Sequence, residues 1–235
     1  MKRKGLSEKT KAILAQVFYG LGLVLIPLAM ILPKMLSPEL INIEMNGVED
    51  YMKYFDMGLV MGLSYLLIFV GVFLIVGKDC YFKNEKQIDK KILVNYFFKF
   101  VAVSYLLQTL AQALVGRVFP TVSTSINQTI FINLLGESPV LMGLATAVLG
   151  PVIEEMIFRY SIFKLFKNKK TALIVSSICF GLMHISLSAS DLFFIPVYCG
   201  MGYIMGKFYY ETNDLRYSTA IHVFNNSFEV LIALL

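Results

Sequence analysis

Tryptophan is absent from this sequence, and charged residues make up only 16% of its 235 positions. Charged residues account for about 25% of an ordinary soluble domain, so this shortage argues against a soluble protein. Cysteine is also scarce, and occurs only as Cys80, Cys179 and Cys199. Their spacing forms no pair, so we expect neither a disulfide framework nor a cysteine-based metal site.

Hydrophobic residues are abundant instead, at 57% of the chain, with a mean hydropathy of +0.69. They occur in blocks, and a run of about 20 apolar residues is long enough to span a bilayer. We therefore expect an all-α fold: a polytopic bundle of about seven transmembrane helices in a single integral membrane domain, residues 1–235, with one extra short re-entrant segment allowed. The expected spans are Ala12–Pro33, Met57–Gly77, Ile92–Val115, Ser138–Phe166, Thr171–Leu187, Leu192–Tyr209 and Thr219–Leu235.

The net charge of +5 comes mainly from lysine-rich loops, since only four of the 21 basic residues are arginines. The lysines gather at the N-terminus and at 78–91, 164–170 and, less strongly, 207–216, which are alternate loops. Such loops mark the cytoplasmic side of a membrane protein, so the pattern predicts a cytoplasmic N-terminus and gives no reason to expect nucleic-acid binding. The preference for lysine over arginine is typical of an AT-rich bacterial genome, and we expect the protein in a bacterial cell membrane.

Few ionisable side chains lie inside the predicted spans. Burying charge in lipid is costly, so such residues mark functional sites by default. Both histidines of the chain fall in apolar runs, and we expect both to lie within helices. The candidate site residues are Glu154, Glu155, Arg159, His184, His222 and Asn226.

The spacing of these residues along their helices predicts how they meet. Glu155 and Arg159 are one helical turn apart, so they can form an ion pair. Glu154 is rotated by about 100° from Glu155 and faces elsewhere. Glu154 and His184 both lie roughly 20 Å from the same lysine-rich loop, so two consecutive antiparallel helices would place them at one level.

The last predicted span carries a second polar face. His222 and Asn226 are one turn apart and point the same way, and Glu229 follows close behind. We expect Glu229 to act as an interfacial anchor, and we expect Asn225 to face away from the site.

This set of groups suits hydrolysis. A carboxylate that faces a histidine can deprotonate a water molecule and return the proton to an amine leaving group. A second histidine and an asparagine amide can donate hydrogen bonds to an oxyanion. The glutamate and two histidines could instead be zinc ligands, but the sequence lacks the HExxH motif, and we expect neither a metal nor another cofactor.

Three motifs together carry a family resemblance. EEMIFR matches the pattern EExxxR, FGLMH matches FxxxH, and HVFNN matches HxxxN. In this order on three predicted membrane helices, they resemble the CPBP family of CAAX-protease and bacteriocin-processing membrane proteins, also called the Abi family and related to Rce1-type prenyl-protein proteases. The resemblance covers about 140–235, which we expect to be the catalytic core.

The resemblance implies an intramembrane endopeptidase of the glutamate type that needs no metal. Glu154 would activate water with help from His184, and the ion pair formed by Glu155 would shape the site. His222 and Asn226 would form the oxyanion hole. The substrate would be a membrane-associated peptide or protein, of CAAX type or a bacteriocin or leader peptide, cleaved at or near the cytoplasmic side of the bilayer.

Two other function classes stay open on the sequence alone. A non-catalytic immunity or regulatory protein could use the same scaffold, although the complete set of catalytic residue types argues against it. An ion or proton transporter could use the line of glutamates and histidines. The paired broken helices and internal repeats of transporters are not visible in the sequence.

Overall fold

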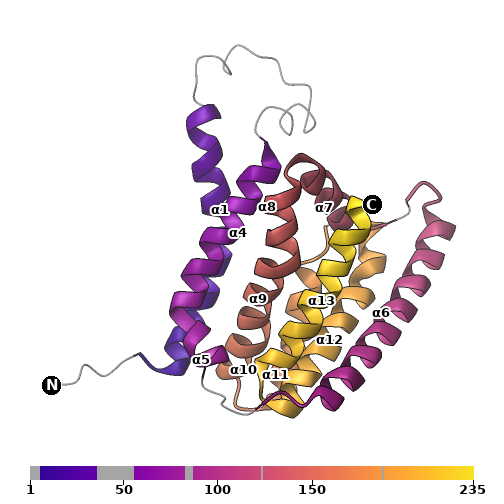
Figure 1. The fold of residues 1–235 in the computed structure, drawn as a ribbon. Coiled ribbons are helices and arrows are strands. Elements are labelled where there is room, and N and C mark those ends of the chain that lie inside the picture. Colours follow the sequence, from indigo (N-terminus) through magenta and orange to yellow (C-terminus); the bar gives the residue numbers. More distant parts are fainter. Residues whose placement is uncertain (1–5, 36–55, 83–86, 123, 187) are drawn as a thin grey trace.

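The computed structural model describes residues 6–35, 56–82, 87–122, 124–186 and 188–235. Within these ranges every regular element is a helix, and the helices run side by side in one bundle (Figure 1). The α-helices are α1 (Glu8–Met35), α4 (Met57–Val72), α5 (Lys78–Tyr81), α6 (Lys90–Val118), α7 (Ile126–Glu137), α8 (Pro139–Leu144), α9 (Gly150–Glu154), α10 (Ile162–Leu165), α11 (Lys169–Leu182), α12 (Ile195–Thr212) and α13 (Leu215–Leu234). Wider π-helical turns at Phe73–Gly77, Ala145–Leu149 and Glu155–Ser161 join some of these into longer rods, and a 3-10 turn at Asp191–Phe194 precedes α12.

The all-helical membrane bundle expected from the sequence is confirmed. Among the described residues, four helical rods are long and apolar enough to cross a membrane: Glu8–Leu32, Met57–Tyr81, Lys90–Val118 and Pro139–Leu165. Helices α11, α12 and α13 lie in the same bundle (Figure 1) and correspond to the three remaining expected runs. The 12-residue α7 is too short to cross a bilayer. It corresponds to the extra short segment that the sequence analysis allowed.

The outer surfaces of α1 and α6 are apolar, as lipid-facing surfaces are. Leu21 and Val24 on α1 are 54% and 63% exposed, and Phe98 on α6 is 65% exposed. Only 17% of the most apolar stretch of either helix is buried, against 61% for the rod Pro139–Leu165. The rod that carries the paired glutamates therefore runs through the interior of the bundle.

Two π-helical segments flank Glu154 in this interior rod. Ala145–Leu149 comes just before Pro151, which has no backbone N–H to donate to the preceding turn. Glu155–Ser161 follows directly after Glu154. Wide turns of this kind are frequent at functional sites, and here they place the glutamate pair at the boundary between two stretches of helix.

Small residues let α11 and α12 approach each other closely. A Cβ atom added at Gly202 would lie 3.0 Å from the backbone oxygen of Ser177, and one added at Gly206 would lie 2.8 Å from Cδ1 of Leu173. The GxxxG spacing of these two glycines indicates such packing in membrane helices. The close approach matters for the site, because α11 ends beside it.

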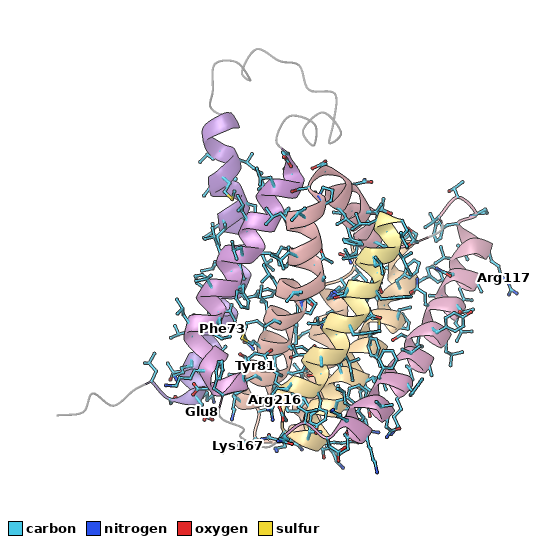
Figure 2. The ribbon with its side chains drawn as sticks, in the orientation of Figure 1. Glu8, Phe73, Tyr81, Arg117, Lys167 and Arg216 are labelled. Carbon is cyan, nitrogen blue, oxygen red and sulfur yellow. The ribbon has the colours of Figure 1, made fainter. Side chains whose placement is uncertain are left out.

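Two ion pairs tie α1 to its neighbours at the lysine-rich end of the bundle. Lys11 Nζ lies 2.6 Å from Asp79 Oδ2, and Lys164 Nζ lies 2.8 Å from Glu8 Oε2. Figure 2 shows Glu8 and Lys167 at this end. The paired side chains are partly exposed, so each pair contributes at most about 1 kcal/mol to stability.

The start of the last helix differs from the expected one. α13 begins at Leu215, ahead of the expected start at Thr219. Asp214 caps the helix, because its Oδ1 accepts a hydrogen bond from the backbone N–H of Arg216 at 3.1 Å. A side-chain oxygen at this position satisfies a backbone donor that the first turn leaves free, so the helix starts within the polar loop.

Candidate active site

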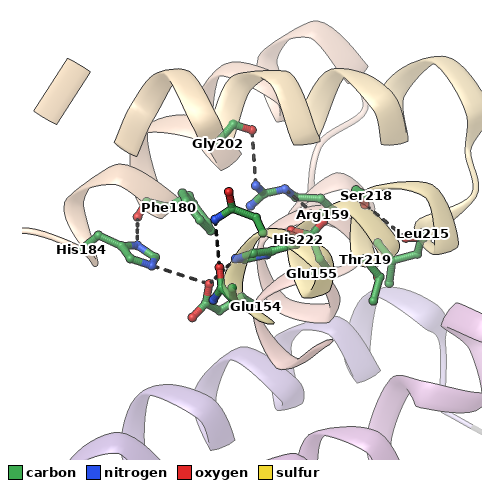
Figure 3. A network of polar contacts seen from close by, with 12 residues as sticks. Glu154, Glu155, Arg159, Phe180, His184, Gly202, Leu215, Ser218, Thr219 and His222 are labelled. Atoms are coloured by element: carbon green, nitrogen blue, oxygen red, sulfur yellow. Dashed lines mark hydrogen bonds and ion pairs between the residues drawn. The ribbon is translucent and has the colours of Figure 1, made fainter. Parts of the chain in front are cut away.

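Glu154 lies between the two histidines of the chain, although both are distant from it in the sequence (Figure 3). Its Oε2 atom is 3.7 Å from Nε2 of His184 and 3.7 Å from Nε2 of His222. This oxygen is buried and makes no hydrogen bond within the described residues. The separation is too long for a direct hydrogen bond and suits contacts bridged by water. Glu154 therefore presents a free carboxylate oxygen to two imidazole rings.

His184 lies in a turn, so the expectation that both histidines are helical is wrong for this residue. α11 ends at Leu182, and the backbone N–H of His184 donates to Gly181 O at 3.1 Å. The ring Nδ1 lies 2.8 Å from Phe180 O. Because a carbonyl oxygen only accepts, Nδ1 carries a hydrogen, and Nε2 is the ring nitrogen that faces Glu154. The same bond satisfies a carbonyl at the helix end.

The His184 ring is held between two aromatic rings. The centroid of Phe180 is 4.4 Å away at an interplanar angle of 31°, and that of Tyr198 is 5.1 Å away at 23°. The Tyr198 hydroxyl is hydrogen-bonded to Ser125 Oγ at 2.8 Å, at the start of α7. The sequence did not single out Tyr198, because a tyrosine in an apolar run carries no distinct signal.

Asp191 fixes the turn that contains His184 against α7. Its side chain is buried, with Oδ1 accepting from Ile126 N–H at 2.8 Å and Oδ2 accepting from Ser186 N–H at 2.6 Å. A carboxylate that accepts two backbone donors holds both segments strongly. The sequence analysis missed this residue. A signal was present, because an aspartate at the end of the serine-rich run SLSASD is typical of a turn held by its own side chain.

Glu155 orients the second histidine. His222 Nδ1 lies 3.1 Å from Glu155 Oε1, and since a carboxylate only accepts, Nδ1 is the donor. The other ring nitrogen, Nε2, then faces Glu154. It accepts a hydrogen bond when the ring is neutral and donates one when the ring is an imidazolium, whose charge Glu155 would balance.

Glu155 is also paired with Arg159, as the four-residue spacing predicts. Arg159 Nε lies 3.4 Å from Glu155 Oε2, and both side chains are fully buried. The guanidinium carbon lies 4.5 Å from the centre of the Phe180 ring, and Nη2 donates to Gly202 O at 3.4 Å. This buried pair therefore supports His222 directly and His184 through Phe180.

Asn226 reaches the site from α13. Its Nδ2 donates to Thr146 O at 3.1 Å, within the wide turn Ala145–Leu149. A carboxamide nitrogen carries two hydrogens, so Asn226 keeps a second donor for a ligand. The structure thus brings together all the residues that the sequence singled out, and their catalytic roles stay predictions: Glu154, Glu155, Arg159, His184, His222 and Asn226.

Residues 136–228, which contain all of these side chains, match the family described as Type II CAAX prenyl endopeptidase Rce1-like. This part of the chain is therefore similar to the Rce1-like family. The Rce1-like region begins at the end of α7 and ends within α13.

Several bacterial proteins are similar to this chain. The membrane-embedded CAAX protease MroQ of Staphylococcus aureus is 27% identical over 88% of this chain and 85% of its own length. UPF0177 protein YxdF of Lactococcus lactis is 29% identical over 69% of this chain and 89% of its own length. A UPF0177 protein from the abiGi 5′ region of Lactococcus lactis subsp. cremoris is 27% identical over 74% and 73%, respectively. No solved structure matches. The chain is a helical membrane protein with a region similar to a family of membrane proteases.

A cavity of about 780 Å³ lies beside Glu154, between the Rce1-like region and helices α1, α4, α6 and α7. His184, His222 and Asn226 also line it. Ligand sites in proteins typically measure about 300–1,000 Å³, so the cavity is large enough for a short peptide segment. A peptide segment bound in the cavity would lie next to Oε2 of Glu154.

Asn225 lines the same cavity, so the expectation that it faces away from the site is wrong. Its Nδ2 donates to Glu229 Oε1 at 3.0 Å and to Asn226 Oδ1 at 3.3 Å. Neighbouring residues on a helix are about 100° apart, and the cavity is wide enough to be bordered by both Asn225 and Asn226. Glu229 is a cavity residue as well.

The cavity lies toward the end of the bundle opposite the lysine-rich loops. Its lining includes α7, the first turn of α12 and the second half of α13. Figure 1 shows α7 and the C-terminus at one end, and α5 and α10 at the other. Since the lysine-rich loops predict the cytoplasmic side, the position of this cavity does not agree with the expectation of cleavage near the cytoplasm.

The zinc alternative would use Glu154, His184 and His222. Among the residues that the structure describes, no group of three or more histidine, cysteine, aspartate or glutamate side chains could hold a metal ion.

Proposed function

We propose that this protein is an intramembrane endopeptidase that hydrolyses a peptide bond in a membrane-associated peptide or protein, with Glu154 as the general base. One observation carries the proposal. The free Oε2 of Glu154 lies 3.7 Å from Nε2 of each histidine, on the wall of a cavity that can hold a peptide segment.

The first step is the activation of water. A water molecule between Glu154 Oε2 and His184 Nε2 is held by two acceptors, so both of its hydrogens are engaged and its lone pairs face the cavity. As the water oxygen attacks the carbonyl carbon of the substrate, one proton passes to Glu154. General-base help of this kind contributes roughly 10²- to 10⁴-fold in rate.

The second step is the stabilisation of the oxyanion that the attack creates. His222 as an imidazolium donates through Nε2, with its charge balanced by Glu155 on the Nδ1 side. Asn226 donates through the hydrogen that Thr146 does not take. Donors fixed in advance at the position of the developing charge are a large source of catalysis.

The third step completes the hydrolysis. Glu154 returns its proton to the amide nitrogen, the carbon–nitrogen bond breaks, and the products are a carboxylic acid and an amine. The carboxylate of Glu154 is regenerated, so the cycle consumes one water and needs no external oxidant or reductant. No lysine or arginine is among the described lining residues, which favours cleavage of an internal bond over recognition of a free C-terminal carboxylate.

The substrate is proposed to be a leader, bacteriocin or signalling peptide, because protein prenylation is not expected in a bacterium. A prenylated CAAX-type substrate is the second candidate, and the name of the Staphylococcus aureus relative favours it. With the cytoplasmic N-terminus that the lysines predict, the cavity faces the outer half of the membrane.

The test compares membrane and secreted peptides from cells that produce the wild-type protein, Glu154→Gln or Glu211→Gln, using mass spectrometry. Glu211 is the matched control carboxylate, because it lies on α12 at the lysine-rich end and does not line the cavity. The expected result is a set of cleavage products that disappears only with Glu154→Gln. Unchanged products from that variant would refute the mechanism. Cleavage by purified protein that stops after chelation and returns with Zn²⁺ would establish the metal version instead.

A further inference from the structure

Carboxamide side chains line part of the cavity. They come from three helices that are far apart in the sequence. The side chains of Gln108 and Gln112 on α6 make no hydrogen bond to another described residue. The carboxamides that line the cavity are Gln108, Gln112, Asn127, Gln128, Asn225 and Asn226.

A carboxamide offers a donor and an acceptor at once, which are the two groups that a peptide bond presents. An extended peptide inside a membrane protein must find partners for all of its backbone N–H and C=O groups, because lipid offers none. The carboxamides that line the cavity can supply such partners whatever the side chains of the peptide are. This part of the cavity therefore suits an unfolded backbone segment next to the bond that is cut.

Charge is distributed unevenly in the cavity. The described lining contains two carboxylates, Glu154 and Glu229, and no lysine or arginine. Glu229 accepts a hydrogen bond from Asn225 Nδ2 at 3.0 Å, and no described residue forms an ion pair with it. Glu154 is assigned to the chemistry, which leaves Glu229 in the binding region with His222, and no lysine or arginine of the described lining, to balance its charge.

We infer that Glu229 is a specificity residue that binds a cationic group of the substrate, a lysine or arginine side chain or a free N-terminal amine. His222 and Glu229 are seven positions apart on α13, which is about 10 Å along the helix. An extended peptide advances about 3.3 Å per residue, so the cationic group would lie about three residues from the cleaved bond. The inference rests on the proposed function, since it names the substrate feature that the same site selects.

The test measures peptide binding in the Glu154→Gln background, where no cleavage is expected. The full-length protein is placed in phosphatidylcholine nanodiscs, whose zwitterionic lipid does not itself attract cations. The probes are fluorescent peptides of alanine, leucine and serine, acetylated and amidated at their ends, with no charge or with one lysine at a varied position. A further probe has a free N-terminal amine and no lysine, which distinguishes the two sources of positive charge.

The expected result is that one cationic probe binds roughly ten- to a hundredfold more tightly than the neutral one, as for a hydrogen-bonded charge pair. Adding Glu229→Gln should bring this ratio close to one. Adding Glu229→Lys should reverse the preference toward a glutamate-bearing probe. Glu211→Gln, outside the cavity, should leave the ratio unchanged. Equal binding of neutral and cationic probes, or a preference that survives Glu229→Gln, would overturn the inference.

The outcome is separable from that of the proposed function. If Glu154→Gln still cleaves peptides, the catalytic mechanism fails whatever the binding ratio is. If wild-type protein cleaves neutral and cationic peptides equally well and Glu154→Gln cleaves neither, the mechanism stands and the role of Glu229 fails.

Discussion

Glu155 Oε1 accepts a hydrogen bond from His222 Nδ1 at 3.1 Å across 67 positions of sequence, while its Oε2 faces Arg159 at 3.4 Å. One buried carboxylate thereby joins the interior rod to α13 and sets which ring nitrogen of His222 faces Glu154. The two adjacent glutamates have separate positions: Glu155 lies between Arg159 and His222, and Glu154 lines the cavity.

The first prediction separates the two glutamates by stability. Glu155→Gln removes the ion-pair partner of the buried Arg159, which costs about 3–5 kcal/mol, whereas Glu154→Gln leaves this ion pair in place. Thermal unfolding in detergent should show a large loss of stability for the first variant and little for the second. The double variant Glu155→Gln/Arg159→Met should recover stability without activity. Equal stability of the two single variants would contradict the assigned pairing.

The second prediction concerns Asp191, whose two oxygens each accept a different backbone N–H. Asparagine keeps one acceptor oxygen, so Asp191→Asn should lose one charged hydrogen bond and about 1.5–3 kcal/mol of stability. It should also lower kcat, because the turn that contains His184 loosens. The measurements are thermal unfolding and peptide cleavage kinetics.

Asp89→Asn is the matched control for this variant. Asp89 caps α6 through Oδ1 alone, and asparagine caps a helix about as well as aspartate. Little change in either measurement is expected there. Equal effects of the two substitutions would show that Asp191 has no special part in the site.

The third prediction tests the aromatic support of His184. Tyr198→Leu removes the stacked ring and should lower kcat by roughly tenfold to a hundredfold, since small displacements of catalytic groups are costly. Tyr198→Phe keeps the ring and loses only the hydrogen bond to Ser125, so it should retain most activity. Steady-state kinetics on one peptide would compare the two, and the reverse order of activities would argue for a direct chemical role of the hydroxyl.

The fourth prediction concerns the packing of α12 behind the site. In Gly202→Ala the added Cβ would lie 3.0 Å from Ser177 O and 3.2 Å from Phe180 Cβ. Crowding of this kind costs about 1–3 kcal/mol, and displacement of Phe180 should also reduce activity. Gly116→Ala on α6 meets nothing within 4 Å and serves as the control. If Gly202→Ala melts at the same temperature as the wild-type protein, then α11 and α12 can move apart to accommodate the added methyl group, which would contradict the prediction.

Helical periodicity explains why much of this could be predicted from the sequence. The pairing of Glu155 with Arg159 follows from a spacing of one turn, and the common level of Glu154 and His184 follows from equal distances to one short loop. Both depend only on the rise and twist of a helix. The start and end points were less predictable, because the caps of α11 and α13 use local side-chain hydrogen bonds.

Other features depend on contacts between segments that are distant in the sequence. Asp191 meets Ile126 across 65 positions, and Ser125 meets Tyr198 across 73. No periodicity within either segment encodes these partners. The same holds for the orientation of Asn225, because the width of the cavity decides which faces of α13 border it.

By itself the sequence determined that this chain is a helical membrane protein, since runs of apolar residues of bilayer length have few other stable states. It also determined which residue types were available for chemistry, because charged and imidazole groups are too costly in lipid to be numerous. Only the tertiary structure decided that Glu154, and not Glu155, keeps an unpaired oxygen between the histidines. That difference arises from packing, which surrounds one carboxylate with Arg159 and His222 and leaves the other on the wall of a cavity.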